Sequence, residues 1–179
     1  MHTTLSQQDS LRNGNVSVPG SKNVYSAGQL GDGVADTPKK KILIVEDEPD
    51  SLEIFVQLLS QVPSYEVSSA VDGLDALAKI EAEQGNLDLV LLDIVMPKMD
   101  GIDVLSKIKS MPEKYGKPLV VMLTNLGGDM AVETAMKLGA NGYLMKIEVE
   151  PQQLLQKVKE YLENSVLYST PNVTPTAQV

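Results

Sequence analysis

Residues 88–101, DLVLLDIVMPKMDG, indicate the fold most clearly, because a short apolar run is followed by an acid, a loop and a glycine. The run DLVLL (88–92) is apolar on consecutive positions after its first residue, as strands are when both faces of a parallel sheet are covered. Beyond the glycine, apolar residues return at helical spacing, at Ile102, Leu105 and Ile108. This stretch therefore predicts a buried strand that leads into Asp93, then a loop and an amphipathic helix.

The same unit occurs five times with a period of about 25 residues, and each apolar run is followed by helical spacing. The five runs are ILIV (42–45), YEVSSA (65–70), DLVLL (88–92), LVVML (119–123) and GYLM (142–145). Strands and helices that alternate in this way predict an α/β fold, a doubly wound parallel sheet of five strands with five flanking helices. The second run is more mixed in polarity, which favours an edge position. Asp50–Ser51 is the predicted cap of the first helix, and Pro151 is predicted to lie in the first turn of the last.

Composition restricts the classes of function that are open to the chain. Hydrophobic residues make up 42% of the 179 residues, which is enough for one globular domain. The absence of cysteine excludes disulfides, thiolate metal sites and a cysteine nucleophile. Residues 41–164 carry 11 lysines, no arginine and 21 acids, and this net charge of −10 disfavours direct contact with nucleic acid.

The chain divides into one predicted domain and two polar ends. Residues 1–40 predict a flexible N-terminal arm, residues 41–164 hold the five units, and residues 165–179 predict a flexible C-terminal tail. No stretch of about 18 uncharged apolar residues occurs, and the N-terminus has no apolar run after a basic start. We therefore expect a soluble, cytoplasmic protein that makes no membrane contact.

Reactive side chains stand where the predicted strands end. Glu46, Asp47 and Glu48 follow the first run, and the later exits carry Asp93, Thr124 and Lys146. In open α/β sheets, ligands bind outside the carboxyl ends of the strands. Each residue alone has an ordinary explanation as a helix cap or a solvated side chain. Together, two acidic exits, a hydroxyl and a lysine suit a divalent cation and a phosphate, and Mg²⁺ prefers such carboxylate ligands.

The motifs ILIVEDEPD, LLDIVMPKMDG, Thr124 and GYLMK stand in the order and spacing of response regulator receiver domains, which residues 41–164 resemble. The resemblance implies a flavodoxin-like strand order of 2-1-3-4-5, which brings strands one and three together at the topological switch point. Because no second predicted domain follows residue 164, we expect a receiver of the stand-alone, single-domain type.

The resemblance implies a role for each site residue. Asp93 resembles the phosphoacceptor, and the expected Mg²⁺ ligands are Asp47 and Asp93 directly, Glu46 through water and Val95 through its backbone carbonyl. Lys146 resembles the lysine that pairs first with the acceptor carboxylate and then with a phosphoryl oxygen. Thr124 resembles the switch hydroxyl, and Tyr143 resembles the aromatic residue that changes rotamer after it.

The same resemblance implies the partners of the chain. The phosphoryl donor would be a phosphohistidine of a histidine kinase or a histidine phosphotransfer protein, because the one histidine here, His2, lies in the predicted arm. The output would be contact with a downstream protein target. The chain would not be an enzyme, except in its own phosphorylation and dephosphorylation.

Several positions depart from the family pattern. Ile147 follows Lys146 where the family commonly has a cis proline, so we predict a trans bond and a reshaped loop. Asn125 replaces a small residue, and its bulk would narrow access to the phosphoryl group or its amide would add a hydrogen bond. Val95 and Leu126 are aliphatic where some relatives have polar side chains that orient the hydrolytic water, which predicts slow loss of phosphate.

Two other functions remain open at this point. A phosphohydrolase of separate substrates is disfavoured, because no second acid follows Asp93 at Ile94 or Val95. A degenerate receiver would keep the fold as a binding module and never be phosphorylated. The intact acidic and basic residues argue against that alternative, whereas Asn125 and Ile147 keep it open.

Overall fold

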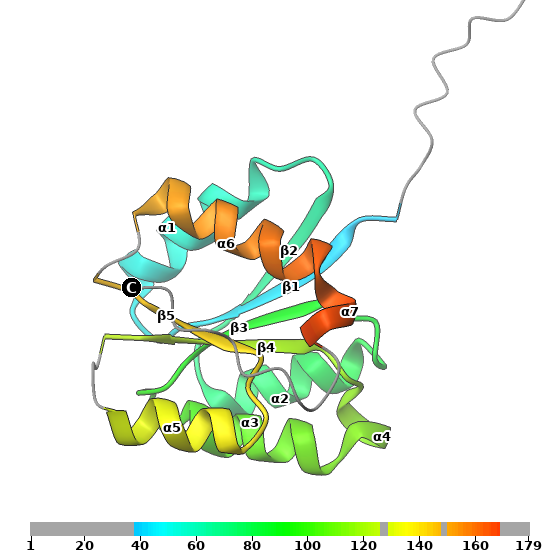
Figure 1. The fold of residues 1–179 in the computed structure, drawn as a ribbon, viewed down its shortest axis with the longest axis vertical. Coiled ribbons are helices and arrows are strands. Elements are labelled where there is room, and N and C mark those ends of the chain that lie inside the picture. The colour runs from blue at the N-terminus through cyan, green and yellow to red at the C-terminus, as the bar shows by residue number, and fades with distance from the viewer. Residues whose placement is uncertain (1–37, 126–128, 148–149, 169–179) are drawn as a thin grey trace, which may run out of the picture. The chain divides into compact units, whose positions relative to one another are not determined.

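The computed structural model describes residues 38–125, 129–147 and 150–168. Within them, five parallel strands form one sheet in the order β2-β1-β3-β4-β5, as Figure 1 shows. The strands are β1 (Lys40–Val45), β2 (Tyr65–Ala70), β3 (Leu89–Asp93), β4 (Leu119–Thr124) and β5 (Gly142–Met145). The predicted fold class and strand order are confirmed. β2 lies at an edge, as its mixed polarity indicated.

Helices cover both faces of this sheet (Figure 1). One face carries α1 (Pro49–Ser60) and α6 (Pro151–Glu163), and the other carries α2 (Gly73–Ala82), α3 (Gly101–Ser110) and α5 (Asp129–Lys137). These are the five helices that the apolar spacing predicts.

Two further helices of four residues each correct the predicted count of five: α4 (Pro112–Tyr115) and α7 (Ser165–Tyr168). A single turn is too short to show helical periodicity in the sequence. One residue, Met111, separates α3 from α4, and α4 begins at Pro112 because proline suits the first position of a helix. α7 extends regular structure four residues beyond the boundary predicted at residue 164.

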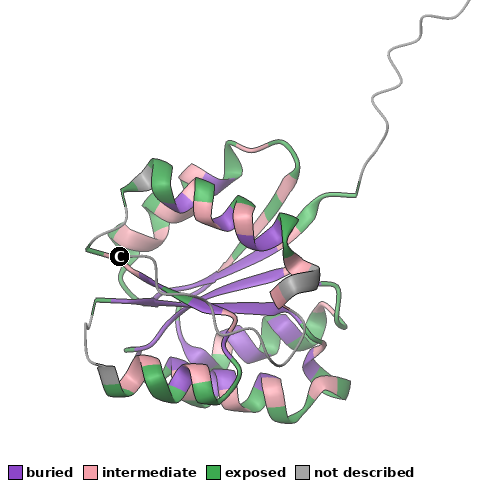
Figure 2. Cartoon of the chain, in the orientation of Figure 1, coloured by how far each residue is buried: buried purple, intermediate pink, exposed green. Residues whose placement is uncertain are grey.

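The core consists of two layers, because successive strand residues point to opposite faces. On β1, Leu43 and Val45 pack toward α2, α3 and α5, whereas Ile42 and Ile44 pack toward α1 and α6. Every residue of β3 and β4 is buried, which explains their consecutive apolar positions (Figure 2). The buried sheet thus holds the carboxyl ends of its parallel strands together at one edge.

The start of the first helix differs from the prediction. α1 begins at Pro49, and Glu48, rather than Asp50–Ser51, is the residue before it. The ring of Pro49 fixes φ at a helical value, so the helix starts at Pro49. Asp50 and Ser51, the two predicted capping residues, therefore lie inside the first turn. The Ser51 hydroxyl instead donates to the Glu48 carboxylate at 2.8 Å. α6 begins at Pro151 as predicted.

Candidate functional site

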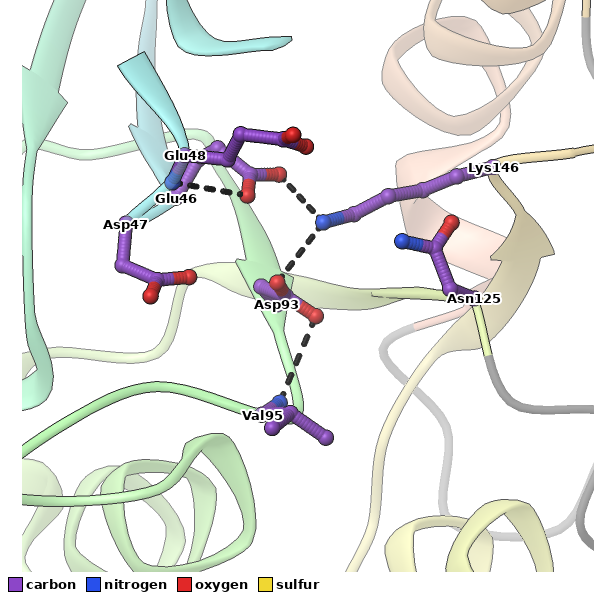
Figure 3. A pocket seen from close by; sticks show the side chains of 7 residues that line it. All are labelled: Glu46, Asp47, Glu48, Asp93, Val95, Asn125 and Lys146. Carbon is purple, nitrogen blue, oxygen red and sulfur yellow. Dashed lines mark hydrogen bonds and ion pairs between the residues drawn. The ribbon is translucent and has the colours of Figure 1, made fainter.

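A pocket of about 290 Å³ opens at the carboxyl edge of the sheet. Its lining, drawn in Figure 3, comes from the ends of four strands and comprises Glu46, Asp47, Glu48, Asp93, Val95, Asn125 and Lys146. The structure therefore brings together the predicted exits of the first, third and fifth runs. It does so because β1 and β3 are neighbours and all five strands point the same way.

Three carboxylates converge in this pocket. Glu46, Asp47 and Asp93 each offer an oxygen, and these oxygens lie within 4.8 Å of one another. Glu46 and Asp93 are buried, with 1% and 6% of their surface exposed, whereas Asp47 is exposed. Burial raises the pKa of Glu46, and the neighbouring Asp93 charge adds to this rise, although Lys146 acts against it. Such crowding fits a divalent cation, because Mg²⁺ binds one or two carboxylates and fills its remaining positions with waters and phosphate oxygens.

Lys146 connects the two buried acids. Its Nζ lies 2.7 Å from Asp93 Oδ2 and is also ion-paired with Glu46 Oε2, and its side chain is 7% exposed. Burial by itself lowers the pKa of Lys146, but the contacts with Asp93 and Glu46 outweigh it and raise the pKa above its ordinary value. The ammonium therefore stays charged beside Asp93 at neutral pH.

Asp93 is the last residue of β3, and the loop that follows β3 folds back against the Asp93 side chain. The Val95 backbone N–H donates to Asp93 Oδ1 at 3.4 Å. A Cβ on Gly101 would lie 2.0 Å from the Asp93 carbonyl oxygen, so only glycine permits the start of α3 to pack there. Gly101, the glycine of the MDG motif, thus leaves the space that the end of β3 needs beside the start of α3.

Thr124 and Tyr143 lie beside the pocket rather than in its lining. Thr124 ends β4 and is fully buried, whereas Tyr143 on β5 is 37% exposed. Tyr143 pairs in register with Met122, two residues before Thr124, so the side chains of Thr124 and Tyr143 leave the sheet on the same face. The two side chains therefore lie on one face of the sheet, next to the carboxyl edge where the pocket opens.

Two of the residues that depart from the family pattern, Val95 and Asn125, line the pocket. Asn125 lines the pocket, and Figure 3 shows its side chain beside that of Lys146. Ile147 is 74% exposed, and the described residues contain no cis peptide bond, so the trans bond predicted before Ile147 is confirmed. The side chain of Val95 is likewise exposed. Leu126 lies outside the described residues.

Sequence reasoning missed one pair near the site, Asp72 and Lys98. Asp72 caps α2, and its carboxylate is ion-paired with Lys98 in the loop after β3. An aspartate before Gly-Leu-Asp is a recognisable capping signal in the sequence. The ion pair is not recognisable, because its members are 26 residues apart in the chain.

Among the helices of the described residues, none has the length and apolar character of a membrane-spanning segment.

The family model described as "Response regulator receiver domain" matches residues 42–159. The chemotaxis protein CheY of Treponema pallidum is 36% identical over 124 residues, which cover 69% of this chain and 83% of that protein. The probable transcriptional regulator ycf27 of Cyanophora paradoxa is 37% identical over 135 residues. That match covers 74% of this chain and 53% of the regulator, so the chain spans about half the length of this relative.

Solved structures agree with these matches. A CheY-like receiver domain protein from Methanospirillum hungatei has a TM-score of 0.64 and 35% identity, over 72% of this chain and 98% of that one. The CheX–CheY complex with BeF3 and Mg from Borrelia burgdorferi contains a chain with a TM-score of 0.62 and 30% identity. That match covers 69% of this chain and 89% of the other.

Proposed function

This chain belongs to the response regulator receiver domain family of two-component signalling, and from that premise we propose that Asp93 accepts a phosphoryl group. The donor is a phosphohistidine on a histidine kinase or a histidine phosphotransfer protein. The observation that carries the proposal is the position of Asp93, which lines a pocket together with a charged lysine in contact with it and two further carboxylates nearby.

Glu46, Asp47 and Asp93 are the side chains that would hold Mg²⁺, with the Val95 backbone carbonyl as a further ligand. The donor set supports this assignment, because three carboxylate oxygens lie within 4.8 Å and one of the acids is exposed to water. When bound, the ion would neutralise charge on the phosphoryl oxygens. The solved CheX–CheY complex of Borrelia burgdorferi contains BeF3 and Mg, which supports the same chemistry here.

In the proposed step, a carboxylate oxygen of Asp93 attacks phosphorus in line with the leaving nitrogen. The new P–O bond forms as the P–N bond of phosphohistidine breaks, and the electron pair of that bond returns to the imidazole nitrogen. Lys146 already contacts Asp93 Oδ2 at 2.7 Å, so its charge is in place to balance the phosphoryl oxygens. The chain acts on itself in this step, so we propose that it is not an enzyme with a separate substrate.

Thr124 and Tyr143 would transmit the change. A charge-assisted hydrogen bond from the Thr124 hydroxyl to a phosphoryl oxygen is worth about 1.5 to 3 kcal/mol, enough to shift a two-state equilibrium about tenfold to 150-fold. Tyr143 leaves the sheet on the same face and is partly exposed, which supports its role as the aromatic group that follows Thr124. The changed surface would bind a downstream protein target.

Other features of the chain concern partners rather than chemistry. The excess of acids over residues 41–164 supports a protein target over direct contact with nucleic acid, and a cytoplasmic location is part of the same proposal. The exposed Ile147 and the rim residue Asn125 change the surface around Lys146, so docking there would differ from that of relatives with proline and alanine.

The test is incubation of the protein with Mg²⁺ and a small acyl-phosphate donor, followed by mass spectrometry. We expect a mass gain of one phosphoryl group that is lost in Asp93→Asn and on chelation of the metal. Asp100→Asn is the matched control, because Asp100 lies in the same loop region and an asparagine keeps its cap on α3. A protein that gains no mass with any donor would instead be the degenerate binding module.

A further inference from the structure

The loop between β3 and α3, residues 94–100, carries Val95 into the site. The backbone N–H of Val95 donates a hydrogen bond to Asp93 Oδ1 at 3.4 Å. The loop closes where the Gly101 N–H donates to the Ile94 carbonyl at 2.9 Å. The position of this loop therefore determines how the Val95 backbone faces the acceptor carboxylate.

Asp72 anchors the loop from outside the site. Its side chain is buried, with 4% of the residue exposed, and Oδ1 accepts from the N–H groups of Leu74 and Asp75 at 2.9 Å each. Its other oxygen, Oδ2, is ion-paired with Lys98 Nζ. The bond from Lys98 lowers the pKa of Asp72, so the carboxylate stays charged at neutral pH. Asp72 thus fixes the start of α2 with one oxygen and holds the loop with the other.

Lys98 has a backbone conformation that needs such support. Its φ is +66°, in the left-handed region that residues other than glycine rarely adopt. Such a conformation persists only when the surrounding structure determines it. The backbone also touches here, because a Cβ on Gly73 would lie 2.6 Å from the Met99 carbonyl oxygen. The ion pair and this close contact join α2 to residues 94–100.

We propose that Asp72 and Lys98 are positioning residues for the site, whose ion pair fixes residues 94–100 with Val95 beside Asp93 and so sets the affinity for Mg²⁺. Neither residue lines the pocket, so each acts through the loop. The proposal rests on the function proposed above, because Val95 and Asp93 are ligands in that function. Asp72 and Lys98 are not among the proposed Mg²⁺ ligands, so the site would include two residues beyond those ligands.

An effect of charge alone predicts a different result from an effect of position. Removal of the Lys98 cation would by itself strengthen the binding of a second cation nearby, whereas removal of the Asp72 anion would weaken it. If the pair acts by position, each removal weakens Mg²⁺ binding. The two removals together then weaken it no more than one, because both break the same contact.

The experiment measures the Mg²⁺ dissociation constant of the unphosphorylated full chain by calorimetry. The variants are Lys98→Met, Asp72→Asn and their combination, and asparagine keeps an oxygen that can cap α2. We expect the dissociation constant to rise about tenfold in all three. Lys98→Arg, which keeps the charge and the pair, should restore binding close to that of the unmodified chain.

A matched control and a metal-free measurement complete the test. Lys114→Met breaks a different ion pair, the exposed one between Lys114 on α4 and Glu81 on α2, and should leave Mg²⁺ binding unchanged. Without metal, the Val95 amide should exchange with deuterium faster in Lys98→Met and in Asp72→Asn than in the unmodified chain.

Two results would overturn the proposal: Mg²⁺ binding in Lys98→Met as tight as in the unmodified chain or tighter, or single effects that add in the double variant. Lack of phosphorylation in the unmodified chain would remove the proposed function and leave this comparison of Mg²⁺ affinities intact. The two failures are therefore distinguishable.

Discussion

Asp93 and Glu46 share one lysine, and this arrangement sets the chemistry at the scale of single residues. Two buried carboxylates with one ammonium between them leave negative charge that a divalent cation can balance. Loss of Lys146 would leave both acids buried without their common cation. We expect the residues around this centre to determine the lifetime of the phosphoryl group proposed for Asp93.

Val95 is the residue whose replacement tests that lifetime. Val95 lines the pocket and is 58% exposed, and its side chain offers no polar group to orient a water molecule. We predict that Val95→Asn shortens the phosphorylated lifetime about tenfold, which corresponds to a barrier lower by about 1.4 kcal/mol. Mass spectrometry after removal of the donor measures the decay.

Val71→Asn is the matched control, since Val71 is a similarly exposed valine, at 53%, in the turn after β2. It should leave the lifetime unchanged. Equal lifetimes in Val95→Asn and the unmodified chain would show that the aliphatic residue at position 95 does not protect the phosphoryl group.

At the scale of elements, the start of α3 packs directly on the end of β3. Gly101 makes this contact possible, because a Cβ there would lie 2.0 Å from the Asp93 carbonyl oxygen. The start of α3 and the end of β3 are thereby fixed to each other by contact between backbone atoms rather than by adjustable side chains. A side chain at this position must displace one of the two elements.

We predict that Gly101→Ala lowers the free energy of unfolding by about 1 to 3 kcal/mol, the usual cost of forcing extra volume into packed structure. Urea denaturation measures it. Ser110→Ala, at the other, exposed end of α3, should change the free energy by less than about 0.5 kcal/mol. An unchanged unfolding midpoint in Gly101→Ala would mean that the helix start moves away without cost.

α6 provides a prediction on pH. Tyr161 on α6 is 9% exposed, and burial, with lesser effects of Tyr168, Glu160 and Tyr143, raises its pKa to about 12. Below pH of about 10, the phenol is neutral in both the folded and the unfolded chain. Between pH of about 10 and 12 it ionises only when unfolded, so stability should fall there by up to about 2 to 3 kcal/mol.

Tyr161→Phe should show a smaller loss of stability across the same pH window, measured by denaturation at each pH, because phenylalanine has no proton to release. Lysines also titrate in this range, so the comparison between the two chains is the test. An equal loss in both chains would contradict the raised pKa of Tyr161.

At the scale of the whole molecule, much of the arrangement could be predicted from the sequence. Consecutive apolar runs predicted the buried strands β3 and β4, and the strand ends pointed to Asp93 and Lys146 because parallel strands end at one edge. The strand order came from the family resemblance. The short helices α4 and α7 were missed, because one turn carries no periodicity.

The missed part of the site has a different cause. Asp72 and Lys98 meet only because α2 and the loop after β3 lie at the same edge of the folded sheet. Nothing in the local sequence of either residue indicates the other. The close contacts of Gly73 and Gly101 likewise depend on backbone positions that only the assembled fold provides.

The central claim is that the phosphoryl group goes to one carboxylate among the 24 of aspartate and glutamate side chains. The most direct test treats the phosphorylated chain with borohydride, which reduces an aspartyl phosphate to homoserine, and then maps the peptides. We predict homoserine at position 93 alone. Reduction at another acid such as Asp47, or no reduced residue in a chain shown to carry phosphate, would contradict the assignment of Asp93.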